Sequence, residues 1–244
     1  MANKPQVIVH RGGGFLAPEN TIEAMKIGLE LPVDGIEIDV LFTKDDVPIV
    51  YHDRSLKRTT NIRRQARKTR YNDLKDLDNG SWFDPAFSSS RIPTLDSFLN
   101  EFAHRRQLYL EVKETGQNLL AIPQLINEHG MLEDTIFLSF HYQALLDIKE
   151  AYPEATTMFL LGARWNRPVE YVLDERIDWF GLSFQLAHKK PKYLKKLLDF
   201  GYPINIWSCN DMDIARKLIS MGITSITTDK PQEMLELIKS SLPR

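Results

Sequence analysis

Two short β-branched segments carry charged residues at alternating positions. Glu37 and Asp39 lie in the first segment, and Glu111 and Lys113 lie in the second. Side chains alternate along a strand, so Glu37 and Asp39 are expected to share one face, as are Glu111 and Lys113. Burying a carboxylate without a nearby positive charge costs free energy. We therefore expect a cation close to these two strand faces. Three carboxylates without a thiolate favour a hard, oxygen-bound ion, Mg²⁺ or Ca²⁺.

Two basic residues offer a second explanation of the same pattern. Arg11 and Lys113 are able to neutralise the carboxylates in a salt-bridge network without any metal. A guanidinium also binds phosphate through two parallel hydrogen bonds, and an ammonium adds a point charge. The residues therefore predict a site for an anionic phosphate ester with one divalent cation, and the salt-bridge network stays open as the alternative.

Two histidines end short β-branched runs, at His10 and His52. One histidine at a strand end is usually structural, but two beside the same carboxylates favour proton transfer, because imidazole titrates near neutral pH. We therefore predict that His10 and His52 act as general acid and base, without assigning which is which. Asp53 follows His52 directly, and it either orients that ring or starts the next turn.

β-Branched runs alternate with amphipathic stretches, which is typical of parallel strands joined by helices. The predicted strands are residues 7–10, 35–40, 108–113, 135–140, 156–161, 178–183, 203–207 and 225–228. This repeat predicts an α/β fold, the (β/α)8 TIM barrel, whose active sites lie at the carboxyl ends of the strands. An open doubly wound sheet is the alternative, although Gly12-Gly13-Gly14 lacks dinucleotide-loop spacing. The first helix is expected to begin at Asn20, with Glu23 completing a capping box.

A polar stretch interrupts the alternation after the second predicted strand. Residues 47–51 predict a short extra strand, and the following stretch, about residues 53–92, is rich in arginine. We expect residues 1–244 to form one barrel domain in which this stretch is a small insertion beside the barrel mouth. Its apolar residues are expected to be too sparse for a core of its own.

The composition excludes several classes of protein. Hydrophobic residues make up 43% of the 244 residues and charged residues 26%, as in ordinary globular domains. The formal net charge of −2 argues against a nucleic-acid partner, and the single cysteine, Cys209, excludes an internal disulfide and a multi-thiolate zinc site. The sequence shows neither a secretion signal nor an apolar run of transmembrane length. We therefore expect a cytoplasmic protein without stable membrane insertion, in an undetermined oligomeric state.

The same residues fall in motifs that resemble those of the glycerophosphodiester phosphodiesterase family, in its short cytoplasmic bacterial form. The similarity runs from about residue 7 to residue 231. The matching motifs are His10-Arg11-Gly12, Pro18-Glu19-Asn20-Thr21, residues 35–40, Thr43-Lys44-Asp45, Val50-Tyr51-His52-Asp53, Arg58-Thr59-Thr60, Ile92-Pro93-Thr94-Leu95, Glu111-Val112-Lys113 and Thr228-Asp229-Lys230-Pro231.

The resemblance implies a TIM barrel that hydrolyses small-molecule glycerophosphodiesters to sn-glycerol 3-phosphate and an alcohol. The implied roles are metal binding by Glu37, Asp39 and Glu111, acid-base catalysis by His10 and His52, substrate or phosphate binding by Arg11, Lys113, Trp207 and Phe184, and support by Glu19, Asn20 and Asp53. The enzymatic alternative is a lysophospholipase D or sphingomyelinase-D-like activity on acylated phosphodiesters. The alternative of another class is a phosphate-ester binding protein without catalysis.

Overall fold

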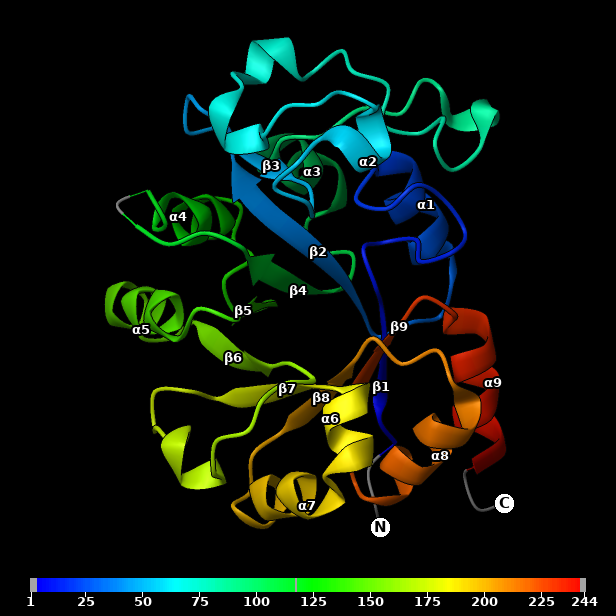
Figure 1. Ribbon diagram of the computed structural model, residues 1–244, viewed down its shortest axis with the longest axis vertical. Helices are drawn as coiled ribbons and strands as arrows, with labels where there is room; N and C mark the ends of the chain where they lie inside the picture. Colours follow the sequence, from blue (N-terminus) through cyan, green and yellow to red (C-terminus); the bar gives the residue numbers. More distant parts are fainter. Residues whose placement is uncertain (1–3, 117, 242–244) are drawn as a thin grey trace.

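A closed barrel of parallel strands forms the centre of the molecule (Figure 1). The structure is a computed structural model that describes residues 4–116 and 118–241. Its barrel strands are β1 (Gln6–Val9), β2 (Gly35–Phe42), β4 (Gln107–Val112), β5 (Thr135–Ser139), β6 (Thr156–Leu161), β7 (Trp179–Ser183), β8 (Ile204–Trp207) and β9 (Ser225–Thr228). Strand β1 pairs in parallel with both β9 and β2, which closes the sheet. The predicted (β/α)8 barrel is thus confirmed, and the open sheet is wrong.

Helices surround the barrel, and side chains alternate between two cores. The helices are α1 (Ile22–Glu30), α3 (Leu95–Phe102), α4 (Ala121–Glu128), α5 (Tyr142–Ala151), α6 (Phe184–Lys189), α7 (Pro191–Asp199), α8 (Met212–Ser220) and α9 (Pro231–Ser241). On β2, Ile36 and Ile38 belong to the outer core that packs against the helices. Ile8 and Tyr109 belong to a separate cluster that fills the barrel interior. No helix within the described ranges is both long and apolar enough to cross a membrane.

The insertion lies beside the barrel, at the top of Figure 1. Strand β3 (Pro48–Val50) precedes it and pairs antiparallel with β2. The insertion itself contains helix α2 (Lys57–Thr60) and short 3-10 helices at Ala66–Lys68, Tyr71–Asp73 and Pro85–Phe87. A small buried cluster lies between the insertion and the strands next to it. Leu41, Ile49, Leu56, Ala66 and Leu74 are among the members of a separate buried cluster. Because β2 extends to Phe42 and pairs with β3, the barrel strand itself supplies part of that small core.

Helix α1 begins one residue later than the sequence predicts. Thr21 is its N-cap, and the Thr21 hydroxyl accepts a hydrogen bond from the Ala24 backbone N–H at 3.2 Å. Asn20 has a left-handed backbone, φ 56°, and its side-chain amide donates to Asp39 Oδ2 at 2.7 Å. Both residue types cap helices well, but Asn20 is drawn into a buried contact with β2 instead.

Candidate active site

The pairing of β2 with β4 brings the three predicted metal-binding carboxylates together. Asp39 and Glu111 are direct partners in the parallel register, and Glu37 precedes Asp39 on the same face of β2. One carboxylate oxygen from each of these residues lies within 4.8 Å of the other two. These side chains lie at the carboxyl end of the barrel, where the site was expected.

Two basic side chains balance part of this negative charge. Lys113 Nζ lies 2.8 Å from Asp39 Oδ1 and 2.7 Å from Glu111 Oε1, and Arg11 Nε lies 3.4 Å from Asp39 Oδ2. Burial favours the protonated form of Asp39, but Lys113 and Arg11 outweigh it and hold the pKa of this carboxyl well below its usual range. The ion pairs considered as the alternative from sequence therefore do form.

Glu37 is left outside this network of charges. Its side chain is buried, and it accepts a hydrogen bond from the Arg11 backbone N–H at 2.9 Å. No lysine or arginine side chain in the described ranges lies within ion-pair distance of it, and His10 Nε2 is 4.0 Å away. Burial and the neighbouring charge of Asp39 raise the pKa of Glu37 to about 8. A divalent cation among the three carboxylates would supply the missing positive charge, so the donor set fits a hard metal ion.

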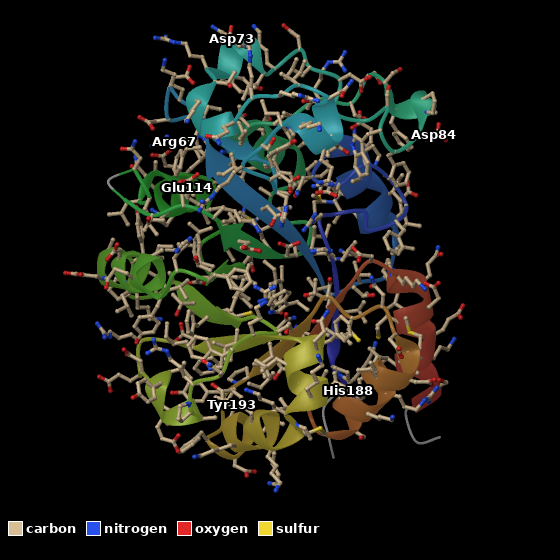
Figure 2. All side chains as sticks on the ribbon, in the orientation of Figure 1. Arg67, Asp73, Asp84, Glu114, His188 and Tyr193 are labelled. Atoms are coloured by element: carbon tan, nitrogen blue, oxygen red, sulfur yellow. The ribbon has the colours of Figure 1, made fainter. Side chains whose placement is uncertain are left out.

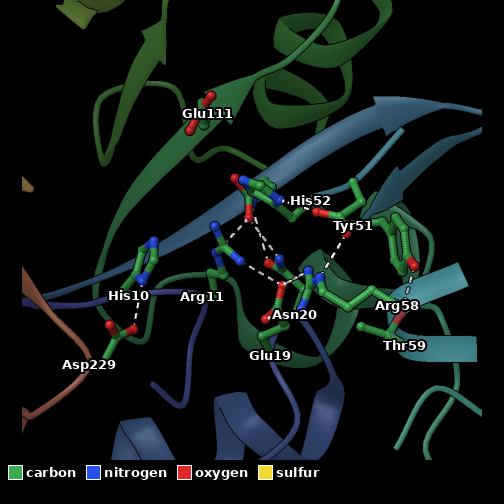
Figure 3. Close-up of polar contacts among 12 residues, drawn as sticks. His10, Arg11, Glu19, Asn20, Tyr51, His52, Arg58, Thr59, Glu111 and Asp229 are labelled. Carbon is green, nitrogen blue, oxygen red and sulfur yellow. Dashed lines mark hydrogen bonds and ion pairs between the residues drawn. The ribbon is translucent and has the colours of Figure 1, made fainter. Parts of the chain in front are cut away.

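His10 follows β1, and a carboxylate from the far end of the chain orients its ring (Figure 3). Its Nδ1 lies 2.6 Å from Asp229 Oδ1, and the Asn210 side-chain amide donates to Asp229 Oδ2 at 2.7 Å. Burial lowers the pKa of His10, but the bond to Asp229 and the charge of Glu37 outweigh it and raise this pKa above its ordinary value. Asp229 was not predicted as a site residue, although the motif at residues 228–231 contains it.

His52 follows β3 and has a similar arrangement. Its Nδ1 lies 2.5 Å from Asp53 Oδ1, and Arg58 Nε donates to Asp53 Oδ2 at 2.7 Å. Asp53 therefore contacts the ring and does more than start a turn. Burial lowers the pKa of His52, and the charge of Asp39 offsets this only in part. In both imidazoles Nδ1 contacts a carboxylate oxygen. The other ring nitrogen, Nε2, is therefore the atom able to exchange a proton with a bound molecule.

Comparison with known proteins identifies the family. The family model described as "Glycerophosphoryl diester phosphodiesterase family" matches residues 10–233. The chain belongs to this family. Accordingly, it is a phosphoric diester hydrolase.

Three proteins similar to this phosphodiesterase match it over nearly their whole length. A glycerophosphodiester phosphodiesterase of Caldanaerobacter subterraneus is 29% identical, over 97% of this chain and 98% of the relative. A solved phosphodiesterase of Oleispira antarctica, in complex with the product sn-glycerol-3-phosphate, has a TM-score of 0.87 at 27% identity and covers 96% of this chain and 97% of its own. A solved glycerophosphodiester phosphodiesterase of Agrobacterium tumefaciens has a TM-score of 0.80 at 26% identity, with 97% and 99% covered.

A second layer of ion pairs in the phosphodiesterase ties the barrel to the insertion. Arg11 Nη1 donates to Glu19 Oε1 at 2.7 Å, and Arg58 donates to both Glu19 oxygens at 2.8 and 2.7 Å. Arg58 also holds Asp53, so it links the loop after β1 to the loop after β3 (Figure 3). Arg11 has φ 50°, and its buried Nε has no hydrogen-bond partner. This Nε lies 3.4 Å from Asp39 Oδ2, so its contact with that carboxylate is an ion pair without hydrogen-bond geometry.

A depression of about 480 Å³ opens beside these groups, and His52, Glu111, Lys113 and Phe140 are among the residues that line it. The Phe140 side chain is 46% exposed and packs edge-to-face on Trp207, with ring centroids 5.3 Å apart. Trp207 thus lies behind Phe140, a residue that the sequence did not single out. Phe184, which was also expected at the pocket wall, is partly buried and packs against the outer core, so its place at the pocket stays a prediction.

Proposed function

We propose that this phosphodiesterase hydrolyses glycerophosphodiesters to sn-glycerol 3-phosphate and an alcohol, with one Mg²⁺ or Ca²⁺ ion bound by Glu37, Asp39 and Glu111. The observation that carries the proposal is the convergence of these carboxylates beside two imidazoles that are each oriented by a carboxylate. The relative solved with sn-glycerol-3-phosphate supports the same product.

The mechanism assigns proton transfer to the two imidazoles. A bound divalent ion would stabilise negative charge that develops on the phosphoryl oxygens. The Arg11 guanidinium offers positive charge to the phosphodiester, and Lys113 adds positive charge at the same place. The nucleophile is water, or the 2-hydroxyl of glycerol, whose cyclic phosphate product water then opens. One imidazole accepts the proton of the nucleophile through Nε2 as the new P–O bond forms, and the other donates a proton to the alkoxide as its bond to phosphorus breaks. His10 and His52 share these two roles.

A direct assay tests the proposal. The enzyme is incubated with glycerophosphocholine or lysophosphatidylcholine, with Mg²⁺, with Ca²⁺ or with a chelator, and the released phosphoester is identified. We expect sn-glycerol 3-phosphate from glycerophosphocholine, loss of activity on chelation and recovery with an added ion. His10→Gln and His52→Gln should each lower kcat by about 10²- to 10⁴-fold. The control is His188→Gln, an exposed position on α6 that is labelled in Figure 2.

Other outcomes would contradict specific parts of the proposal. A higher kcat/KM on lysophosphatidylcholine would assign a phospholipase-D-like activity. Binding of glycerophosphodiesters without turnover would indicate a binding protein. Activity that persists in the chelator would show that the three carboxylates do not act by binding a metal ion. A near-normal kcat in either histidine variant would show that the replaced histidine does not transfer a proton.

A further inference from the structure

A second hollow, of about 670 Å³, lies on the insertion and is rich in positive charge. It is lined by the cationic residues Lys44, Lys57, Arg63, Arg64, Lys68 and Arg70. Asp73 is the one acidic residue among its lining residues, and Figure 2 shows Asp73 on the cyan segment at the top of the molecule. We call this site the basic hollow.

Nearby carboxylates offset the positive charge of the basic hollow only weakly, as Asp45 does by interacting with Arg70 from beyond ion-pair distance. None of the six cations forms an ion pair with a carboxylate in the part of the chain that the structure describes, whereas the neighbouring Arg67 pairs with Asp46. All six side chains are exposed. The clustering of these six cations does not reflect an overall excess of positive charge, because the whole chain has a net charge of −2. Like charges around one hollow repel each other, so a bound anion would relieve the repulsion.

The backbone around the basic hollow is held in place by hydrogen bonds and buried side chains. The Leu56 N–H donates to Arg64 O at 2.9 Å, and the Lys44 N–H donates to Thr69 O at 3.0 Å. Leu56 and Ala66 belong to the small core of the insertion, directly beneath these segments of chain. The shape is therefore largely formed before any ligand binds, which lowers the entropic cost of binding. A concave site of this volume fits a discrete phosphorylated molecule better than a flat membrane surface.

The basic hollow adjoins the catalytic depression. Ser55 lines both, and it follows His52, Asp53 and Arg54, which line the catalytic depression. A ligand bound at the catalytic centre therefore reaches the basic hollow if it extends past Ser55. Extra phosphate on the part of the substrate that faces the insertion would meet the unpaired cations there.

We propose that the basic hollow binds a further phosphate group on the alcohol part of the substrate. The favoured substrates are then glycerophosphodiesters whose leaving alcohol itself carries a phosphate or phosphodiester group. This inference rests on the proposed function, because it extends the same site.

A matched pair of substrates tests the inference. Deacylated cardiolipin, in which a central glycerol carries two glycerophosphate groups, is compared with glycerophosphoglycerol, which lacks the second phosphodiester. The readout is the ratio of their kcat/KM values. We expect a ratio above one that falls about tenfold in the double variant Arg63→Gln/Arg64→Gln, mainly through KM, and that also falls as salt is added. The control Arg216→Gln/Lys217→Gln removes the same charge from exposed positions on α8 and should leave the ratio unchanged.

A binding measurement separates this inference from the proposed function. Calorimetry gives the Kd of both compounds for His52→Gln, in which we expect turnover to be slowed about 10²- to 10⁴-fold, with and without the two arginine changes. Tighter binding of deacylated cardiolipin that depends on Arg63 and Arg64 supports the inference, even if neither compound is hydrolysed. Hydrolysis of both compounds with equal kcat/KM and equal Kd would overturn it and leave the proposed function intact. Arginine-dependent binding to anionic vesicles without any preference between the two compounds would also overturn it, in favour of a lipid surface.

Discussion

Each imidazole of the active site is held by a carboxylate from a nearby loop: Asp229 for His10 and Asp53 for His52. Such a contact fixes the ring orientation and directs the proton to Nδ1, which leaves Nε2 for chemistry. The Asp53 contact is local, so the sequence raised it as an alternative. Asp229 is 219 residues from His10, and only closure of the barrel through β1 and β9 brings the two together. Local spacing holds no information on such a pair.

Asp229 is expected to act as a positioning residue for His10. Asp229→Asn should lower kcat about 10- to 100-fold, because the ring loses its orienting carboxylate. Asp229 contributes to the raised pKa of His10, so its loss should lower that pKa and move the corresponding limb of the kcat–pH profile to lower pH. The profile is measured beside Asp211→Asn, a control at the N-cap of α8 where asparagine also caps. A reduced kcat with an unmoved pH profile would assign Asp229 a structural role only.

At the scale of elements, the strands follow closely from the sequence, whereas the start of the first helix does not. Strands β6 and β9 match the predicted ranges 156–161 and 225–228, because buried β-branched runs leave little freedom in a parallel sheet. The start of α1 was misplaced because Asn20 and Thr21 are both good caps, and the choice depends on the distant Asp39. The small buried cluster of the insertion could not be predicted from residues 53–92 alone, because β2 and β3 contribute Leu41 and Ile49 to it.

Close packing between α1 and the loop after β1 positions Arg11. A Cβ atom at Gly28 would lie 2.0 Å from the Gly12 carbonyl oxygen. Alanine in a helix normally stabilises by about 1 kcal/mol over glycine. Here Gly28→Ala should instead lower the free energy of unfolding by about 1–3 kcal/mol and lower kcat/KM, because the loop must shift.

Urea unfolding and steady-state kinetics measure both effects of Gly28→Ala. Glu30→Ala, at the exposed end of the same helix, is the control and should change stability by less than about 0.5 kcal/mol. A Gly28→Ala protein that is more stable than the natural chain and equally active would show that α1 does not constrain the loop.

At the scale of the whole molecule, the barrel and its insertion meet around a cluster of charges that is incompletely balanced. Lys113 and Arg11 neutralise Asp39 and Glu111 only in part, and Glu37 has no cationic partner among the described lysines and arginines. The alternating pattern was sufficient to predict that these carboxylates converge. The pattern was not sufficient to predict which of the carboxylates have a cationic partner, because this depends on distances that the register of β2 and β4 fixes.

Cation binding should therefore stabilise the folded protein as a whole. At about 100 times its Kd, Mg²⁺ or Ca²⁺ adds about 2.7 kcal/mol to the free energy of unfolding, which corresponds to a rise in Tm of roughly 5–10 °C. Glu37→Gln should abolish most of this rise, and without a cation its Tm should equal or exceed that of the natural chain, since an unbalanced buried carboxylate is removed.

Calorimetric melting with and without each ion gives these Tm values. Glu236→Gln, at an exposed position on α9, is the control and should keep the full response. An unchanged Tm in the natural chain at high Mg²⁺ and high Ca²⁺ would contradict a cation site at Glu37, Asp39 and Glu111.

The left-handed backbone of Arg11 limits how far the stability of this protein can be raised by directed evolution without loss of activity. A non-glycine residue at φ 50° is strained by about 1–3 kcal/mol, and glycine would release that strain. Directed evolution for heat resistance alone would thus favour glycine at position 11 and discard the guanidinium that we propose to bind the substrate phosphate. A screen that requires turnover in every round would retain the arginine and accept its conformational cost.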